Sequence, residues 1–145
     1  MADEVPVLRE LLQALSDHDG GGQVASVENL VAQGFGARVL YWAVMAWDGD
    51  QALGMVIYFP EYSTHSGRTG VYVQDLFVAD AARGIGVGRG LLAAAMQVQD
   101  WGAAFMTLGI SPGNAGGRAF YARQGFRARG YEMMIIDGAA LEALR

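Results

Sequence analysis

The sequence has 145 residues but contains no cysteine and no lysine. Without cysteine, the chain forms no disulfide, offers no thiolate to a metal and has no cysteine nucleophile. Without lysine, it has neither the lysine of a Walker A phosphate loop nor the amine of a Schiff-base enzyme. These absences exclude several large enzyme classes, and the lack of cysteine suits a reducing compartment.

Histidine and positive charge are also scarce. The two histidines, His18 and His65, lie far apart in sequence, so we expect no metal site. The formal net charge of -5 disfavours a nucleic-acid partner, because phosphate backbones require a basic face. An acidic protein mildly attracts cationic substrates, which is a weak hint because many proteins are acidic for solubility alone.

Long apolar runs are absent as well. The longest fully apolar stretch, residues 39–47, is too short to span a bilayer, and the acidic N-terminus lacks the apolar region of a signal peptide. We therefore expect a cytoplasmic protein with no membrane partner. The length fits a single domain over residues 1–145.

The first half of the chain predicts two helices followed by a β-hairpin. Ser26 is a suitable N-cap for the second helix, with Ala32 near its end and Gly34 as its stop. The hairpin turn is Asp48-Gly49-Asp50, and the Pro, Ser, Thr, His and Gly residues after the hairpin read as a loop. The expected ranges are a helix at 3–17, strands at 39–47 and 52–59, and a loop at 60–70.

The next expected strand, residues 71–78, changes its phase part-way along. Val71 and Val73 share a face, but the apolar pattern resumes at Leu76 and Val78 instead of at Asp75. A β-bulge produces such a one-residue slip, and bulges concentrate near active sites. The alternative is a strand buried on both faces, with Asp75 at its end.

A glycine-rich turn follows this strand and precedes an expected helix at 87–99. Successive backbone N–H groups at a helix start form an anion site, and Gly84, Gly86 and Gly88 allow an anion to approach closely. Arg83 adds a permanent charge. The turn therefore predicts a phosphate or pyrophosphate ligand. Two alternatives remain. The glycines could serve close packing only, or the turn could bind a dinucleotide. A dinucleotide site normally has an acidic residue about twenty positions further on, which binds the ribose, and this sequence has none there.

The remainder of the chain predicts alternating strands and helices. A chain break at 111–114 precedes a helix that ends at Gln124, and Gly125 follows it in the C′ position. The other expected elements are strands at 104–110 and 131–136 and a closing helix at 138–144. This order indicates an α/β fold with a mixed sheet.

Two motifs resemble those of the GNAT superfamily of N-acetyltransferases. The run RGIGVGRGLL at 83–92, after a strand LFV, resembles its acetyl-CoA signature, and Asn114 with AFYARQGF at 119–126 resembles its second motif. The resemblance implies a GNAT fold, with a mixed, mostly antiparallel central sheet flanked by helices, and acetyl-CoA as cosubstrate. The implied cosubstrate-binding residues are Leu76, Phe77, Val78, Arg83, Gly84, Ile85, Gly86, Val87, Gly88, Arg89 and Asn114.

Nearly the whole chain is similar to one branch of that superfamily, the diamine N-acetyltransferases. Four stretches carry the similarity: Gly34-Phe35-Gly36, Tyr62-Ser63-Thr64, Tyr72 to Val78, and Gly130-Tyr131 to Asp137. The branch acetylates small-molecule amines and forms homodimers through its C-terminal strand. The resemblance therefore implies a primary amine as acceptor and a homodimer.

Three departures from this branch concern the acceptor and the sheet edge. Gln74 stands where the branch has a glutamate that contacts the substrate ammonium, and His18-Asp19 replaces its Tyr-Glu pair. His18, Asp19 and Gln74 are therefore the candidate substrate-binding residues, although His18 and Asp19 also suit a solvated helix end. Members of the family begin with a strand before the first helix, and this sequence has no counterpart of that strand. Two explanations remain: the start codon is misassigned, or the strand at 39–47 is a true edge of the sheet.

The sequence offers no carrier for an acyl-enzyme, so we expect direct attack of the amine on the thioester. By resemblance, Tyr121 is the acid that protonates the departing thiolate; the alternative is a core aromatic. Asp75 either relays the proton of the amine or anchors the bulge. Two other functions remain open: a non-catalytic acetyl-CoA sensor, which the glutamine at position 74 favours, and an acetyltransferase that acts on a protein amine.

Overall fold

Helix α1 (Val5–His18) forms where apolar residues recur at helical spacing. Its inner side is buried at Val5, Leu8 and Leu11. Leu8 and Leu11 pack against Met55 and Ile57 of the sheet, where each of these four side chains is less than a tenth exposed. The predicted helix at 3–17 is confirmed, preceded by a short 3₁₀ turn, η1 (Ala2–Glu4).

The computed structural model describes residues 1–145, which form two units, Met1–Leu108 and Gly109–Arg145. Each unit is described separately. The first unit holds η1, α1, α2 (Val27–Phe35), β1 (Trp42–Asp48), β2 (Gln51–Ser63), β3 (Arg68–Val78), η2 (Asp80–Ala82), α3 (Val87–Val98) and β4 (Met106–Leu108). The second holds α4 (Ala115–Gln124) and α5 (Gly138–Glu142).

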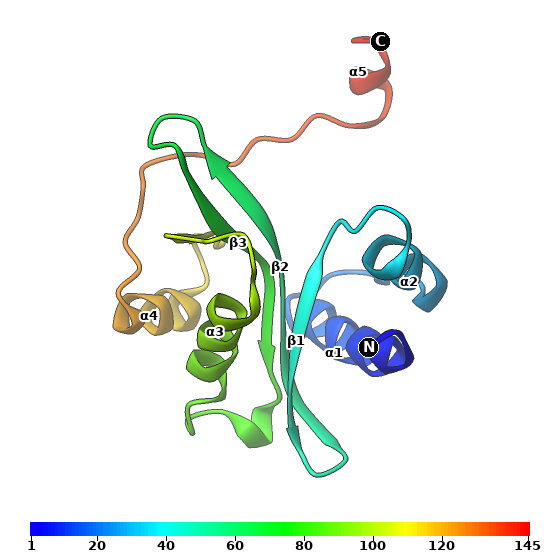
Figure 1. Ribbon diagram of the computed structural model, residues 1–145, viewed down its shortest axis with the longest axis vertical. Helices are drawn as coiled ribbons and strands as arrows, with labels where there is room; N and C mark the ends of the chain where they lie inside the picture. The colour runs from blue at the N-terminus through cyan, green and yellow to red at the C-terminus, as the bar shows by residue number, and fades with distance from the viewer. The chain divides into compact units, whose positions relative to one another are not determined.

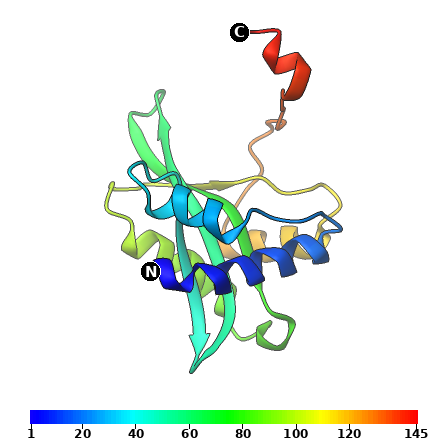
Figure 2. The ribbon, with the colours of Figure 1, turned by 90° about the vertical axis from the view of Figure 1, so that its right-hand side faces the viewer.

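The sheet of the first unit has the order β1-β2-β3-β4. β2 pairs antiparallel with β1 and β3, whereas β3 and β4 pair in parallel. Helices α1 and α2 cover one face of this sheet and α3 covers the other (Figures 1 and 2). The predicted mixed, mostly antiparallel sheet flanked by helices is therefore confirmed. We call the two sides the α1 face and the α3 face.

The α3 face carries its own apolar core. Leu91, Leu92 and Ala95 of α3 are buried, as are Tyr58 and Val73 of the sheet. The indole of Trp101 lies 5.1 Å from the ring of Trp42 and 6.2 Å from that of Tyr58. With a layer packed on each side, β2 and β3 are held rigidly at the centre of the unit.

The predicted bulge is present in β3. Ile57 of β2 lies opposite Asp75, but the next residue, Tyr58, lies opposite Val73. Gln74 is therefore the extra residue, and it is exposed. The slip places Leu76 and Val78 on the same face as Val73, and it directs Asp75 to the α1 face with Ile57.

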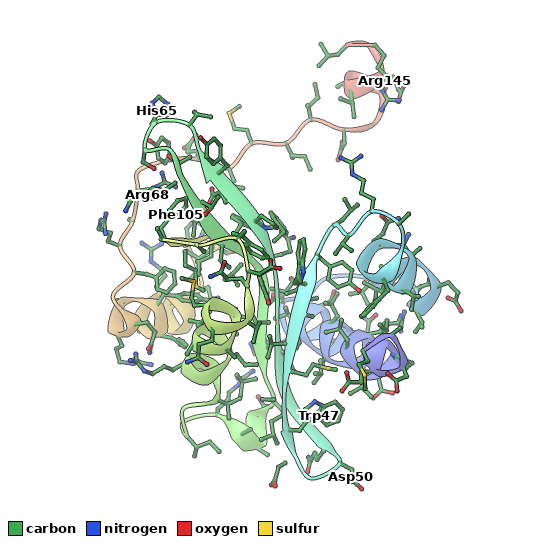
Figure 3. All side chains as sticks on the ribbon, viewed as in Figure 1. Trp47, Asp50, His65, Arg68, Phe105 and Arg145 are labelled. Carbon is green, nitrogen blue, oxygen red and sulfur yellow. The ribbon has the colours of Figure 1, made fainter.

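The predicted loop at 60–70 is wrong. β2 continues to Ser63 and β3 begins at Arg68, so only the tip of this long hairpin, where Figure 3 places His65, is a turn. Pro60 was the strongest loop signal. β2 tolerates it because pairing with β1 ends at Tyr58, so Pro60 lies on a free edge where no N–H is required.

Helix α2 begins where its N-cap serine predicts, because the Ser26 side chain accepts a hydrogen bond from the backbone N–H of Asn29 at 3.1 Å. The predicted stop at Gly34 is wrong, since the helix includes Gly34 and ends at Phe35. Gly34 is needed for another reason: a Cβ there would lie 2.7 Å from the ring of Tyr41. The Tyr41 hydroxyl donates to the Leu30 carbonyl at 2.8 Å and ties α2 to the chain before β1.

Replacing Ser26 by Ala should lower the free energy of unfolding by about 1 kcal/mol, because one N–H at the start of α2 loses its acceptor. Urea unfolding followed by circular dichroism measures the change. Ser66→Ala is the matched control, since Ser66 is exposed and its hydroxyl makes no hydrogen bond. Equal stability of the two variants would contradict a capping role.

In the second unit, helix α4 has the ends that the sequence predicts. The Asn114 side chain caps its start, and Gly125 terminates it with a positive φ of 99°. The predicted strand at 131–136 is wrong, because this segment pairs with no other strand. The predicted strand at 104–110 and helix at 138–144 are present but shorter, as Met106–Leu108 and Gly138–Glu142.

Candidate active site

The glycine-rich turn between β3 and α3 adopts a backbone that only glycine takes readily. Gly84 has φ 80° and Gly86 has φ 88°, and Gly86 is the N-cap of α3. A Cβ at either position would have no atom within 4 Å, so the turn is open to solvent on that side. The unpaired N–H groups of the first turn of α3 lie next to this opening. The turn therefore fits an anion such as the pyrophosphate of CoA.

Arg83 braces this turn. Its Nε donates to the Val78 carbonyl at 3.0 Å, and its Nη1 lies 3.0 Å from an Asp80 carboxylate oxygen. The guanidinium thus joins the end of β3 to the start of the turn. Ile85 is largely exposed, while Val87 and Gly88 are half-buried and Arg89 is exposed on α3. All residues of the predicted phosphate turn lie in one continuous segment.

The β3 edge that faces β4 is free over the last residues of the strand. Val71, Tyr72 and Val73 pair with Met106, Thr107 and Leu108, and the pairing ends there. From the bulge at Gln74 to Val78, β3 is paired only with β2. On the other edge, the backbone groups of Leu76 and Phe77 therefore have no strand partner, whereas the Val78 carbonyl already accepts from Arg83.

Asp75 is a half-buried carboxyl group on the α1 face. Burial raises its pKa above the ordinary value for aspartate, and the nearby carboxylate of Asp19 raises it further. Asp19 is the C-cap of α1, so the helix end brings these two acidic groups together. His18 and Gln74 are both exposed, His18 at the end of α1 and Gln74 in the bulge.

Replacing Asp75 by Asn should stabilise the protein at neutral pH. The raised pKa means that the folded state binds more protons than the unfolded state in the pH window just above the ordinary aspartate value, so stability falls as pH rises through that window. Asparagine does not titrate, so the variant does not lose stability as pH rises through this window. Its melting temperature should exceed that of the wild type at pH 7, and the difference should vanish below the ordinary aspartate pKa.

Melting curves between pH 3 and pH 8 test this expectation. Asp50→Asn is the control, because Asp50 lies exposed in the β1–β2 turn (Figure 3). A stability difference between Asp75→Asn and the wild type that is independent of pH would contradict the argument.

Tyr121 and Asn114 belong to the second unit. The Tyr121 ring packs edge-on against Phe120 at 5.2 Å and Phe126 at 5.3 Å. Burial raises the pKa of its phenol above the ordinary value, so the hydroxyl keeps its proton throughout the physiological range. The Asn114 side chain accepts from the backbone N–H of Gly117 at 2.9 Å, so its oxygen is already used as the helix cap.

Glu61 is a polar residue of the α1 face that the sequence analysis missed, because it falls in the range expected to be a loop. Glu61 lies on β2, half-buried, and accepts a hydrogen bond from the Thr107 hydroxyl of β4. It forms no ion pair. Glu61 is four residues after Ile57 on the same strand, so both side chains lie on the face that carries Asp75. The same spacing in the sequence could have identified this residue if the segment had been predicted as a strand.

The order of these features, a bulged strand followed by an anion-binding turn and a helix, agrees with a match at the level of sequence. Residues 9–126 match the acetyltransferase (GNAT) family. This chain belongs to that family. It is therefore an acetyltransferase, and enzymes of this family take the acetyl group from acetyl-CoA.

Solved structures share the fold. An integron cassette protein from the mobile metagenome of V. cholerae is 23% identical, with a TM-score of 0.77, 99% of this chain covered and 90% of that one. An aminoglycoside acetyltransferase from an uncultured soil metagenomic sample, solved with sisomicin, is 14% identical, with a TM-score of 0.76. The match covers 94% of this chain and 91% of that one. A ribosomal-protein-alanine N-acetyltransferase from Brucella melitensis is 17% identical, with a TM-score of 0.73. The match covers 94% of each chain.

No curated protein matches the sequence significantly. The similar structures act on different acceptors, an aminoglycoside in one case and a ribosomal protein in another, so the family alone does not name the amine. No helix of this GNAT protein has the length and apolar character needed to cross a membrane.

Proposed function

We propose that this acetyltransferase transfers the acetyl group of acetyl-CoA to a primary amine of a small molecule, by direct attack of the amine on the thioester. The observation that carries the proposal is the half-buried Asp75 with Asp19 beside it. Neither carboxylate has an ion-pair partner in the structure. An alkylammonium group would supply the missing positive charge.

The raised pKa of Asp75 suits it to accept a proton. An alkylammonium has a pKa near 10 and must lose a proton before it can attack. A carboxylate of raised pKa is a stronger base than an ordinary one, so Asp75 is better matched to this task, directly or through water. Gln74, His18 and Asp19 are the other residues that we assign to the acceptor.

The cosubstrate residues follow from the free backbone groups. The N–H groups of Gly84 to Gly88 hold the pyrophosphate, and the free edge of Leu76 to Val78 holds the pantetheine and the acetyl carbonyl. We assign Arg89 to a CoA phosphate, and Asn114 to the second family motif. Tyr121 protonates the departing thiolate, and its protonated phenol supports this role.

An acceptor that is a protein amine is the second candidate. The segment at 60–70, expected to be a loop, is instead two paired strands with a short turn between them. One structural neighbour is a ribosomal-protein-alanine N-acetyltransferase. A peptide acceptor therefore belongs in any test of substrate.

Release of free thiol from acetyl-CoA across a panel of acceptors tests the proposal. The panel holds polyamines, thialysine, amino acids, aminoglycosides and a peptide with a free N-terminus. Turnover of a small amine, lowered in Asp75→Asn but retained in Asp50→Asn, supports the proposal. Turnover of the peptide alone, or acetyl-CoA binding with no turnover on any acceptor, overturns it.

The resemblance to the diamine branch also leads us to propose a homodimer formed through the C-terminal segment. The apolar side chains of residues 131–136 support this, because they are unpaired and strongly exposed, with Met134 at 90% and Ile135 at 87%. Sedimentation velocity of the wild type and of Ile135→Asp tests this interface. A dimer that the substitution does not weaken contradicts it.

A further inference from the structure

Glu61 makes a hydrogen bond across the sheet that the proposed chemistry does not use. It lies on β2 and accepts from the Thr107 hydroxyl on β4, although β3 lies between these two strands. The residue of β3 that pairs with Glu61 is Gly70. Because Gly70 has no side chain, the Glu61 carboxylate extends over the β3 backbone on the α1 face and reaches Thr107. One side-chain bond therefore links β2 to β4 across the strand between them.

Space, and not backbone conformation, requires a glycine at position 70. Gly70 is buried and is not among the glycines with a positive φ. A Cβ there would lie 2.3 Å from a ring carbon of Phe105, the residue directly before β4 (Figure 3). The Phe105 carbonyl accepts from the Val71 N–H at 2.9 Å. The glycine thus admits both the Phe105 ring and the Glu61 side chain on one face of β3.

The two ends of β4 are held in different ways. Backbone hydrogen bonds fix the chain before the strand, where the Ala104 N–H donates to the Thr69 carbonyl at 2.8 Å. The strand itself has three ladder pairs with β3 and ends at Leu108. Thr107 directly precedes this last residue. Its bond to Glu61 therefore holds β4 next to the point where β3 and β4 separate.

This point of separation decides how much of the β3 edge a ligand can reach. Beyond it, the backbone groups of Leu76 and Phe77 have no strand partner on this edge. Unpaired N–H and C=O groups of a strand edge attract further pairing, because each gains a hydrogen bond. The bulge at Gln74 disrupts such pairing from the β3 side. The bond between Glu61 and Thr107 restrains β4 from its own side.

The chemistry of this bond makes it an effective restraint. A hydrogen bond from a hydroxyl to a carboxylate is about twice as strong as one between neutral groups. Glu61 is half-buried, so loss of its donor leaves a carboxylate that water solvates only in part. If β4 moved along β3 by one residue, Thr107 would turn to the α3 face and this bond would be lost.

We propose that Glu61 is a positioning residue for acetyl-CoA binding. By holding Thr107, it ends the pairing of β3 with β4 at Val73 and keeps the edge at Leu76 and Phe77 open for the pantetheine arm. Glu61 contacts no substrate in this arrangement, because it acts through β4. The inference rests on the proposed placement of the pantetheine, and it does not depend on which acceptor the enzyme acetylates.

Thr107→Val tests the bond, because valine removes the hydroxyl but remains β-branched and suits a strand. If β4 pairs further along β3 in some molecules, the apparent affinity falls by the fraction that stays open. Calorimetric titration should therefore show a dissociation constant for acetyl-CoA that is about 5- to 10-fold higher than in the wild type. Thr107→Ser restores the hydroxyl and should return this constant to within about twofold of the wild type.

Variants of Glu61 test the other partner. Glu61→Leu should weaken acetyl-CoA binding as much as Thr107→Val does. The double variant should be no weaker than either single variant, because both substitutions remove the same bond. Glu61→Gln keeps a carbonyl oxygen that accepts from Thr107, so its affinity should lie between those of the wild type and Glu61→Leu.

A second ligand separates positioning from general damage to the fold. The nucleotide half of CoA, 3′-phospho-ADP, keeps the pyrophosphate and lacks the pantetheine, so all variants should bind it as the wild type does. Thr64→Val is the matched control, because it makes the same change at an exposed position of the hairpin turn. It should leave both affinities unaltered. Circular dichroism at the titration temperature confirms that each variant is folded.

Four outcomes overturn the proposal. In the first, Thr107→Val binds acetyl-CoA as tightly as the wild type. In the second, Thr107→Ser binds it as weakly as Thr107→Val. In the third, acetyl-CoA and 3′-phospho-ADP lose affinity equally, which indicates general damage. In the fourth, Glu61→Gln loses as much affinity as Glu61→Leu, which indicates that the charge itself contacts a ligand. A wild type that binds no acetyl-CoA contradicts the proposed function as well, so the two failures are distinguishable.

Discussion

Replacing Tyr121 by Phe should lower kcat for acetyl transfer by roughly 10²–10⁴-fold, the range associated with loss of one acid–base group. Phenylalanine keeps the edge-on packing against Phe120 and Phe126 and removes only the hydroxyl. Because burial raises the pKa of this phenol, the hydroxyl is protonated at neutral pH and is able to donate to the leaving thiolate. The KM for acetyl-CoA should change little, since the proton transfer occurs only in the transition state.

Steady-state thiol release at saturating acetyl-CoA measures this effect. Tyr131→Phe is the matched control, because Tyr131 lies in the same unit but is 78% exposed, and it should retain full activity. If Tyr121→Phe keeps kcat within about threefold of the wild type, which is under 1 kcal/mol of barrier, the assignment of Tyr121 as the acid is wrong.

Replacing Gly86 by Ala should weaken acetyl-CoA binding by roughly 10- to 100-fold. Gly86 has φ 88°, a conformation that costs an L-residue about 1–2 kcal/mol, so the turn would rearrange. The rearrangement withdraws at least one backbone N–H from the pyrophosphate. A hydrogen bond to a charged group is worth about 1.5–3 kcal/mol, which corresponds to the stated loss of affinity.

Calorimetric titration with acetyl-CoA gives the dissociation constant. Gly90→Ala is the matched control, because Gly90 lies in the regular part of α3 and a Cβ there would have no atom within 4 Å. That change should leave affinity unaltered and add about 0.5–1 kcal/mol of stability, since alanine favours a helix interior. Equal affinities for the two variants would exclude the glycine turn as the pyrophosphate site.

Some expectations failed where an element depends on a neighbour. The apolar run at 131–136 predicts a strand, but a strand takes its hydrogen bonds from another strand, and this segment has none in the described chain. Residues 60–63, expected in a loop, are strand because β3 supplies the partner for β2 as far as Ser63. Glu61 was missed for the same reason, because a residue assigned to a loop has no predicted face.

The sequence by itself determined the features whose causes are local. The Ser26 cap, the apolar stripe of α1, the slip at Gln74–Asp75 and the glycine turn all follow from hydrogen bonds, periodicity or φ preferences within a few residues. Tertiary structure alone decided which distant groups meet. It placed Asp19 close enough to Asp75 to raise the pKa of that carboxyl, and it paired β2 with β3 as far as Ser63. Both results depend on how a helix packs on a sheet and on which strand has a neighbour, and no local pattern encodes either.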